Sequence, residues 1–313
     1  MRVRKIKVKI VSTNRDLYNV FIFIIHESIV NIIERKINMQ PSVLAFGEIL
    51  FDVFDGQACI GGASFNFAAH FSRLGGESYM ASAVGADEMG TSAMRYADNY
   101  KIHKDYIAVL PDKSTGYCNV TLENGHPCYE LVRNVAYDAI PMIPVERSFD
   151  AIYYGTLAQR DSRSAETLSL LLRNVRHKHA FFDINIRQDF YTQQIIELGL
   201  KNATILKFSR EESFVFGDYA SLEELCRRLH KKAPGLKIII VTLDADGAMI
   251  YSCGKDAFYY SRKPQAVVVS TVGAGDSFSA AFMYNYIKGE CIESCIEAAI
   301  ALSERIVSQK GAV

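Results

Sequence analysis

Lys237-Ile238-Ile239-Ile240-Val241-Thr242 carries four consecutive apolar, β-branched residues at its centre. A strand with one face in water alternates apolar with polar residues, whereas a strand covered on both faces is apolar throughout. The stretch therefore predicts a central strand of a parallel sheet that helices cover on both sides.

Outward from this stretch, short β-branched or aromatic runs alternate with longer amphipathic segments. This alternation is typical of βα units around a mostly parallel sheet, and predicts an α/β fold. We expect core strands at residues 43–48, 79–84, 151–154, 180–183, 203–207 and 237–242. We expect helices at residues 64–74, 164–176, 221–232, 276–286 and 291–308, with Ser164 and Ser221 as plausible N-caps.

Two segments, residues 51–60 and 115–133, have a residue pattern that differs from that of the βα units. The second alternates polar and apolar residues around Glu123-Asn124-Gly125, and the Asn-Gly pair indicates a hairpin turn. Together the segments predict a small antiparallel sheet that covers a cleft like a lid. Alternatively, they are edge strands of the core sheet.

The composition bounds the class of protein. The chain has 313 residues with 35 Lys plus Arg and 35 Asp plus Glu, so no net field draws it to nucleic acid or an anionic membrane. Its seven cysteines show no CxxC pair and indicate reduced thiols, hence a cytoplasmic protein. Cys291 and Cys295 are spaced for a metal but lack partners nearby, so ordinary helix side chains are the simpler interpretation.

The first 38 residues differ from the rest, since they are rich in Lys and Arg and loosely imitate a signal peptide. The apolar run from Val20 to Ile25 stops at His26 and falls short of the roughly 20 residues that a membrane helix needs. We therefore interpret residues 1–38 as an extension that need not be native, Met39 as the start, and residues 39–313 as one domain.

The sharpest chemical signal is Ser270-Thr271-Val272-Gly273-Ala274-Gly275-Asp276-Ser277-Phe278, just before a helix rich in small residues. Glycines there let consecutive amides face one point, where the helix dipole favours phosphate oxygens. Asp276 at the edge of this site is either an N-cap or the base that deprotonates an attacking hydroxyl. No GxxxxGK[ST] loop competes as a phosphate cradle.

A second signal is Ile60-Gly61-Gly62-Ala63-Ser64-Phe65-Asn66. The paired glycines permit a ligand to approach the backbone closely. The amide of Asn66 can both donate and accept hydrogen bonds to sugar hydroxyls, although a lone Asn is more often a cap.

In this order, the two signals resemble the ribokinase-type (PfkB) carbohydrate kinases over residues 41–313. The resemblance implies a three-layer α/β sandwich with a mostly parallel central sheet and a small β-sheet lid, which excludes water on closing. It also implies ATP and Mg²⁺ as cofactors, a small-molecule sugar as the binding partner, and in some members a homodimer formed through the lid.

The resemblance assigns roles residue by residue. Catalytic roles fall on Asp276 as the base and on the anion-hole residues Gly273, Ala274 and Gly275. Substrate binding falls on Asp52, Gly61, Gly62, Asn66 and Arg187, and nucleotide binding on Lys207, Ser209, Thr242, Gly247 and Thr271. Glu212 would organise magnesium through water.

Three positions depart from the family pattern. Ser209 replaces the usual asparagine, Asp244 stands where glycine is usual, and Ser270 replaces an aspartate near the monovalent-cation site of some members. We therefore predict no potassium dependence. The departures also leave open a sugar or nucleotide sensor that has lost catalysis.

Two segments suggest which sugar accepts the phosphoryl group. Asp183-Ile184-Asn185-Ile186-Arg187 resembles a segment of fructokinases and 2-keto-3-deoxygluconate kinases, and Asn134-Val135-Ala136-Tyr137-Asp138 is similar to fructokinases. Fructose is the first expectation. The 2-keto-3-deoxy acid follows, because Arg187 or Arg133 would suit an acidic acceptor, and ribose or a nucleoside comes third.

Overall fold

The computed structural model describes residues 40–123, 126–309 and 311–313, and Pro41–Val313 forms one compact unit. The predicted extension, residues 1–38, and the proposed start at Met39 lie outside the described residues. None of the helices in the described ranges is long and apolar enough to cross a membrane.

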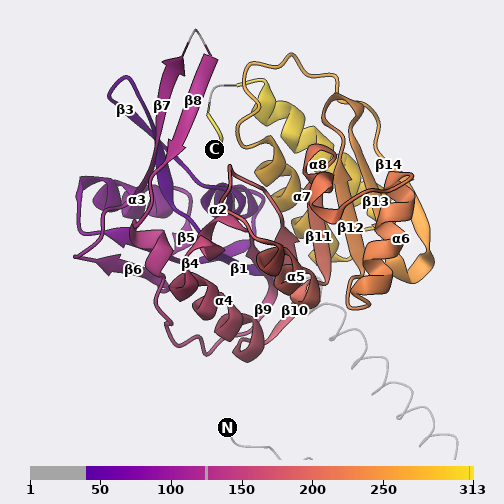
Figure 1. Cartoon of the computed structure of the whole chain (residues 1–313), viewed down its shortest axis with the longest axis horizontal. Coiled ribbons are helices and arrows are strands. Elements are labelled where there is room, and N and C mark those ends of the chain that lie inside the picture. The colour runs from indigo at the N-terminus through magenta and orange to yellow at the C-terminus, as the bar shows by residue number, and fades with distance from the viewer. Residues whose placement is uncertain (1–39, 124–125, 310) are drawn as a thin grey trace, which may run out of the picture. The chain divides into compact units, whose positions relative to one another are not determined.

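A large, mostly parallel sheet forms the centre of this unit, as predicted (Figure 1). Its strands are β1 (Ser42–Phe46), β4 (Glu77–Gly85), β5 (Ile102–His103), β6 (Ile107–Leu110), β9 (Phe149–Tyr154), β10 (His177–Asp183), β11 (Ile205–Ser209), β12 (Ile238–Thr242), β13 (Ala248–Ser252) and β14 (Ala257–Tyr260). They follow the order β14-β13-β12-β11-β10-β9-β1-β4-β5, and β6 also pairs with β4. Among the described strands of this sheet, the pairs β12-β13 and β13-β14 are antiparallel and the other pairs are parallel. All six predicted core strands are confirmed.

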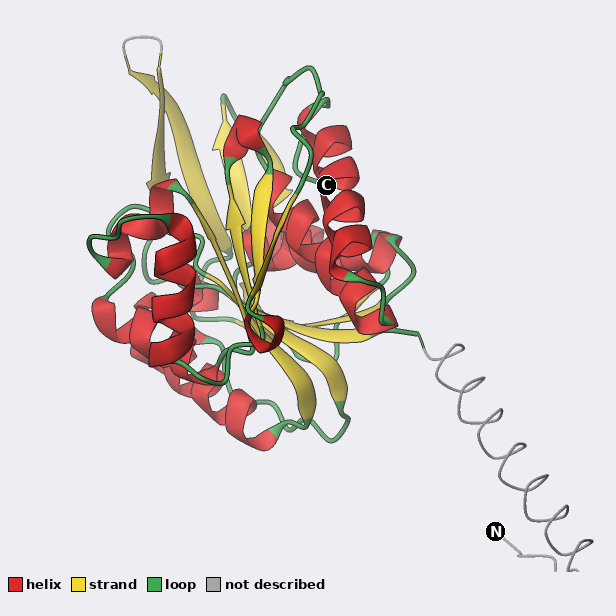
Figure 2. Cartoon of the chain, turned by 90° about the vertical axis from the view of Figure 1, so that its right-hand side faces the viewer, coloured by secondary structure: helices red, strands yellow, loops and turns green. Residues whose placement is uncertain are grey.

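Helices cover both faces of the sheet, which makes three layers (Figure 2). One face is packed by α4 (Ser162–Asn174), α5 (Gln193–Asn202) and α6 (Leu222–Lys232), and the other by α2 (Ala63–Arg73), α3 (Glu88–Asn99), α7 (Ala274–Lys288) and α8 (Ile292–Val307). In β12, Ile239 and Val241 join the first core, and Ile238 and Ile240 the second. The apolar run is explained by this double coverage.

Short 3-10 helices follow several strands at the carboxyl edge or in the connections. They are η1 (Ala136–Ala139), η2 (Leu157–Arg160), η3 (Glu211–Phe216), η4 (Asp244–Asp246) and η5 (Cys253–Lys255). The turns η2, η3 and η4 come after β9, β11 and β12, so they border the edge where these parallel strands end.

One of the two predicted helix caps is confirmed. Ser221 accepts a hydrogen bond from the amide of Glu224 at 3.2 Å. The prediction for Ser164 is wrong, because α4 begins earlier and Asp161 is its N-cap. Ser164 is fully buried, and its hydroxyl donates to the carbonyl of Tyr137 at 2.8 Å. Asp161 and Ser164 are both common N-cap residue types, and the buried one, Ser164, does not serve as the cap.

The two lid segments form one separate sheet, so the alternative of edge strands of the core is wrong. The sheet contains β2 (Leu50–Phe54), β3 (Gln57–Gly61), β7 (Gly116–Glu123) and β8 (His126–Leu131), in the order β3-β2-β7-β8 (Figure 1). The prediction that this sheet is antiparallel is wrong at one pair, because β2 and β7 are parallel. The hairpin is confirmed by the antiparallel pair Glu123 and His126, although Asn124 and Gly125 lie outside the described residues. Because β2 follows β1 after three residues, the lid rises from the carboxyl end of the parallel strands.

Candidate active site

The predicted anion hole opens α7. Gly273 is the N-cap of this helix with φ of +80°, a left-handed conformation that favours glycine. No side chain in the described part of the chain hydrogen-bonds as a cap to this end. The first amides of a helix lack partners within it, so Gly275 and Asp276 present their N–H groups at the positive end of α7. The N–H of Ala274, which was also predicted for the anion hole, instead donates to the carbonyl of Thr271 at 3.3 Å. This arrangement suits phosphate oxygens.

Asp276 lies in the first turn of α7 and is 8% exposed. Its Oδ2 accepts a hydrogen bond from Asn66 Nδ2 at 2.8 Å. Asp276 is not the N-cap, because Gly273 holds that position and no side chain of the described residues caps this end. Burial raises the pKa of Asp276 to about 6, an effect that the Asn66 hydrogen bond and the cations of Arg187 and Lys207 oppose. A buried carboxylate with this pKa can accept a proton near neutral pH.

The glycine pair before α2 brings Asn66 to the base. Gly62 has φ of +103°, and a Cβ there would lie 2.7 Å from the carbonyl oxygen of Glu48. Glu48 Oε1 accepts from the amide of Ala63 at 2.8 Å, which ties the end of β1 to the start of α2. Burial raises the pKa of Glu48, although hydrogen bonds from backbone amides lower it in part.

Asn66 also keeps an unused acceptor. Its Oδ1 is buried without a hydrogen-bond partner among the described residues. Buried polar atoms are almost always paired in folded proteins, so an unpaired one beside a base indicates a place for a ligand or water. The hydrogen bond to Asp276 fixes the amide with Oδ1 as the free end.

Asp52 and Arg187 face the same region from the lid and the body. Asp52 lies in β2, and a Cβ on Gly61 would be 3.3 Å from its Oδ2. Burial raises the pKa of Asp52, and Arg187 lowers it. Because Arg187 also lowers the pKa of Asp276, its guanidinium lies within electrostatic reach of both carboxylates. The structure therefore brings Asp52, Asn66, Arg187 and Asp276 together.

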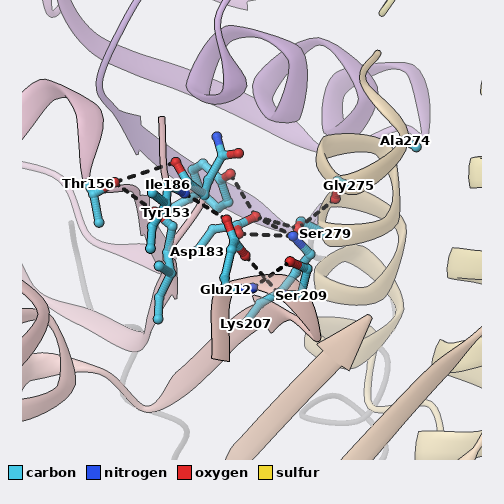
Figure 3. A network of polar contacts seen from close by, with 12 residues as sticks. Tyr153, Thr156, Asp183, Ile186, Lys207, Ser209, Glu212, Ala274, Gly275 and Ser279 are labelled. Carbon is cyan, nitrogen blue, oxygen red and sulfur yellow. Dashed lines mark hydrogen bonds and ion pairs between the residues drawn. The ribbon is translucent and has the colours of Figure 1, made fainter. Parts of the chain in front are cut away.

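A buried polar network lies beneath the anion hole (Figure 3). Lys207 Nζ donates to both oxygens of Asp183 at 2.9 Å, and the two side chains are 7% and 1% exposed. Asp183 Oδ2 also accepts from Tyr153 and Ser279, at 3.1 and 2.9 Å. Burial alone would lower the pKa of Lys207, but neighbouring carboxylates led by Asp183 raise it overall, which keeps the amine charged.

Lys207 lies directly under the first turn of α7. A Cβ on Gly275 would be 3.3 Å from its Nζ, so a larger residue at 275 would crowd the amine. The charge of Lys207 thus adds to the helix dipole at the predicted phosphate site. The sequence did not indicate that Asp183, Tyr153 and Ser279 belong to this network. An aspartate at the end of an otherwise apolar strand was the available signal.

Ser209 and Glu212 form a reciprocal pair at the end of β11 (Figure 3). Ser209 Oγ accepts from the amide of Glu212 at 3.2 Å, and Glu212 Oε2 accepts from the amide of Ser209 at 2.7 Å. The reciprocal bonds are those of a capping box, formed one residue before Arg210, the N-cap of η3, and the Ser-x-x-Glu spacing is visible in the sequence. Glu212 Oε1 also accepts from the amide of Ile186 at 2.7 Å, which joins the ends of β10 and β11.

Each carboxylate oxygen of Glu212 therefore holds one amide and keeps a lone pair for water or a cation. Within the described residues, no three His, Cys, Asp or Glu side chains gather at metal-binding spacing. The magnesium role of Glu212 stays a prediction. Cys295 is buried in α8 while Cys291 is exposed at its N-cap, as expected for ordinary helix side chains.

The other predicted nucleotide residues border this region. Thr242 ends β12, and its carbonyl accepts from the amide of Arg210 beside Ser209 at 2.9 Å. Gly247 has φ of +96°, and a Cβ there would lie 2.7 Å from a backbone carbonyl, so the turn into β13 requires glycine. Thr271 is exposed, three residues before the start of α7. Their contacts with a nucleotide stay predictions.

Asp244 occupies a left-handed position with φ of +51°, which explains why glycine is usual there. Its carboxyl group faces that of Glu211, which raises the pKa of Asp244. The side chain is thus engaged with a neighbouring carboxyl group at the edge of the nucleotide region.

Comparison with known proteins agrees with this geometry. A family model described as pfkB family carbohydrate kinase matches residues 29–313. The aminoimidazole riboside kinase of Salmonella typhimurium is 24% identical over 278 residues, which cover 82% of this chain and 84% of that protein. The fructokinase of Rhizobium leguminosarum is 28% identical over 263 residues, covering 80% and 77%.

A solved structure shares the fold. The fructokinase of Vibrio cholerae with fructose, ADP and calcium superimposes with a TM-score of 0.76 at 21% identity, covering 87% of this chain and 94% of that one. At this identity the likeness concerns the fold: the large parallel sheet, the helices on both faces and the smaller separate sheet.

Proposed function

Because the chain belongs to the pfkB family of carbohydrate kinases, which are phosphotransferases that act on sugars, we propose that it transfers the γ-phosphoryl group of ATP to a primary hydroxyl of fructose. The observation that carries the proposal is Asp276. It is a buried carboxylate whose pKa is raised to about 6, in the first turn of a helix whose uncapped end suits phosphate. Phosphoryl transfer needs this combination of a base and an electrostatic cradle.

The chain's own residues supply three actions. Asn66 holds Asp276 in place through a 2.8 Å hydrogen bond, and its free Oδ1 accepts from an acceptor hydroxyl. Asp276 takes the proton of the hydroxyl that attacks. The first amides of α7, with Lys207 beneath them, bind and stabilise the transferred phosphoryl group.

The residues also fit ATP with Mg²⁺. Bound Mg²⁺ would neutralise charge on the phosphates during transfer. Glu212 fits such an ion through water, since each of its oxygens accepts one amide and keeps one lone pair. Thr242 and Gly247, beside the end of β11, would line the nucleotide side of the cleft.

Closure of the lid would keep water from the reaction. The lid sheet carries Asp52 in β2 and rises beside the end of β1, so a sugar bound to Asp52 and Asn66 would lie between lid and body. Exclusion of water matters because water competes as a phosphoryl acceptor and would lead to futile ATP hydrolysis.

Fructose is favoured by the fructokinase among the relatives and by the segment from Asn134 to Asp138. One observation supports a second acceptor, a sugar acid such as 2-keto-3-deoxygluconate. Arg187 is largely exposed, and its guanidinium lies within electrostatic reach of Asp52 and Asp276, so it is placed to bind a carboxylate. Arg133 is less available, because it lies over the ring of Phe190 and pairs with Asp189.

The test is ADP release from Mg-ATP with fructose, 2-keto-3-deoxygluconate, ribose and adenosine in separate reactions. We expect turnover with fructose, and a loss of about two to four decades in Asp276→Asn while Mg-ATP still binds. Near-normal turnover in Asp276→Asn would contradict the assignment of the base. ATP binding with no turnover on any acceptor would favour a sensor without catalysis.

A further inference from the structure

Helix α2 carries two buried polar side chains one turn apart, Asn66 and His70. Residues four apart lie on one helix face. Asn66 donates to Asp276 in α7 at 2.8 Å, and the Nε2 of His70 lies 2.7 Å from the carbonyl oxygen of Ala312. One face of α2 therefore holds both the base and the segment 311–313, which is 242 residues from His70 along the chain.

The ring of His70 is the donor in this contact. A carbonyl oxygen can only accept, so Nε2 must carry the hydrogen. Burial lowers the pKa of His70 to about 4, although the hydrogen bond to Ala312 raises it in part. The ring is therefore neutral at neutral pH, in the tautomer with hydrogen on Nε2. The contact is a hydrogen bond in the core, since His70 is 1% exposed.

Ala312 in turn lies directly against the anion hole. A Cβ added to Gly273 would lie 2.6 Å from the carbonyl oxygen of Ala312 and 2.7 Å from its Cα. Ala312 is itself 6% exposed. The segment 311–313 thus packs behind the turn whose amides face the predicted phosphate. His70 hydrogen-bonds to the carbonyl oxygen of Ala312, which packs against Gly273.

We propose that His70 is a positioning residue for phosphoryl transfer: it holds the segment 311–313 behind Gly273 and so fixes the amides that open α7. This inference rests on the proposed function for the reaction it serves. His70 does not touch substrate, since the segment 311–313 stands between it and the turn. Its effect comes from the placement of Gly273, and misplacement of a catalytic group by about 1 Å can lower a rate as much as 100-fold.

A purely structural histidine would behave differently in two respects. Loss of His70 should lower kcat and the affinity for ATP, because Gly273 serves the phosphate. It should leave the KM for the sugar nearly unchanged, because Asn66 and Asp52 are held by other contacts. Glutamine at this position should restore function, since its Nε2 is a donor on a side chain of similar reach.

The experiment compares His70→Leu and His70→Gln in the full chain with His179→Leu as the matched control. His179 is a partly buried histidine whose pKa burial also lowers to about 4, but it lies near the start of β10, away from the site. Steady-state kinetics give kcat and the KM values for the sugar and for ATP. Backbone amide hydrogen exchange, with and without Mg-ATP, measures how well residues 273–277 and 311–313 are protected.

We expect His70→Leu to lower kcat about tenfold, to leave the sugar KM within about twofold, and to speed exchange at both segments. His70→Gln should recover most of the rate, and His179→Leu should match the wild type. Unchanged kcat and exchange in His70→Leu would overturn the proposal. So would equal losses in the leucine and glutamine variants, or a loss in His179→Leu as large as in His70→Leu.

The two proposals fail separately. Wild-type protein without turnover on any acceptor would contradict the kinase reaction but leave the exchange measurement informative. In that case, protection of residues 273–277 by Mg-ATP that disappears in His70→Leu and returns in His70→Gln would still support the role of His70. Protection that is the same in all variants would refute it.

Discussion

Replacement of Asn66 by leucine should change the pH dependence of the reaction in a direction that the structure specifies. Asn66 Nδ2 donates 2.8 Å to Asp276 Oδ2, and this bond favours the ionised carboxylate. Leucine is similar in size but donates nothing. The carboxylate would remain buried without its donor, so the pKa of Asp276 should rise above its value of about 6.

The size of the change follows from the strength of the lost bond. A hydrogen bond to a charged group contributes about 1.5–3 kcal/mol, and each pH unit corresponds to about 1.36 kcal/mol. Asp276 is 8% exposed, so water replaces little of the bond. The acid limb of kcat/KM should therefore move up by about one to two pH units, and the ionised fraction at pH 6 should fall from about half to about a tenth or less.

The assay is the pH profile of kcat/KM for the sugar, which reports ionisations of the free enzyme. Weaker sugar binding in Asn66→Leu would lower the whole profile without moving the limb. Asn285→Leu is the control, because Asn285 also donates from an amide, to the carbonyl of Ala281 within α7, but lies near the far end of that helix. A limb at the wild-type position in Asn66→Leu would refute the assignment of that limb to an Asp276 held by Asn66.

Four further outcomes follow from the same contacts. Lys207→Met should lower the free energy of unfolding in urea by about 3–5 kcal/mol, because it leaves the carboxylate of Asp183 buried without its cation. The double variant Lys207→Met with Asp183→Leu should lose less stability than the two single variants together, and additive losses would contradict a buried pair. Gly273→Ala should lower kcat at least about tenfold, since φ of +80° and the adjacent backbone of Ala312 disfavour a Cβ at this position. A normal kcat would count against close packing of Ala312 on Gly273. Glu212→Gln should raise the Mg²⁺ concentration for half-maximal rate several-fold, and an unchanged Mg²⁺ titration would remove Glu212 from that role. Acid should destabilise the fold from about pH 6.5 down to about 4, because buried His70 stays neutral in that range while the same residue of the unfolded chain binds a proton. In His70→Gln, the urea concentration at the midpoint of unfolding should therefore fall less between about pH 7 and 5 than in the wild type. An equal fall would show that His70 does not contribute.

The lid and the body contribute different parts of the candidate site. Asp52 lies in the lid, whereas Asn66, Lys207 and Asp276 belong to the α/β layers. The α/β layers therefore hold the base and the phosphate turn, and lid movement would change mainly the sugar side. Variants in the lid are expected to alter the sugar KM and the ratio of ATP hydrolysis to sugar phosphorylation.

The amino-acid sequence alone was sufficient for the fold class, because periodicity is a local property. The apolar run in β12, the alternation around Asn124-Gly125 and the glycines before α2 and α7 each act within a few residues. Two helices were missed for a local reason as well. Buried positions of α3 are the small residues Gly90, Ala93 and Ala97, so α3 presents little apolar surface. Helix α5 buries Ile196 and Leu200, but it is only ten residues long and Gly199 within it weakens the helix signal.

Only the tertiary structure decided how the residues of the site act on one another. Asn66 and Asp276 are 210 residues apart in the chain, and Asp183 and Lys207 meet because β10 and β11 are neighbours in the sheet. The same holds for His70 and Ala312. A pKa depends on burial and on charges that surround a group in space. The sequence therefore identified Asp276 as a candidate base, whereas packing of α2 against α7 and burial of its carboxylate determine whether it can accept a proton.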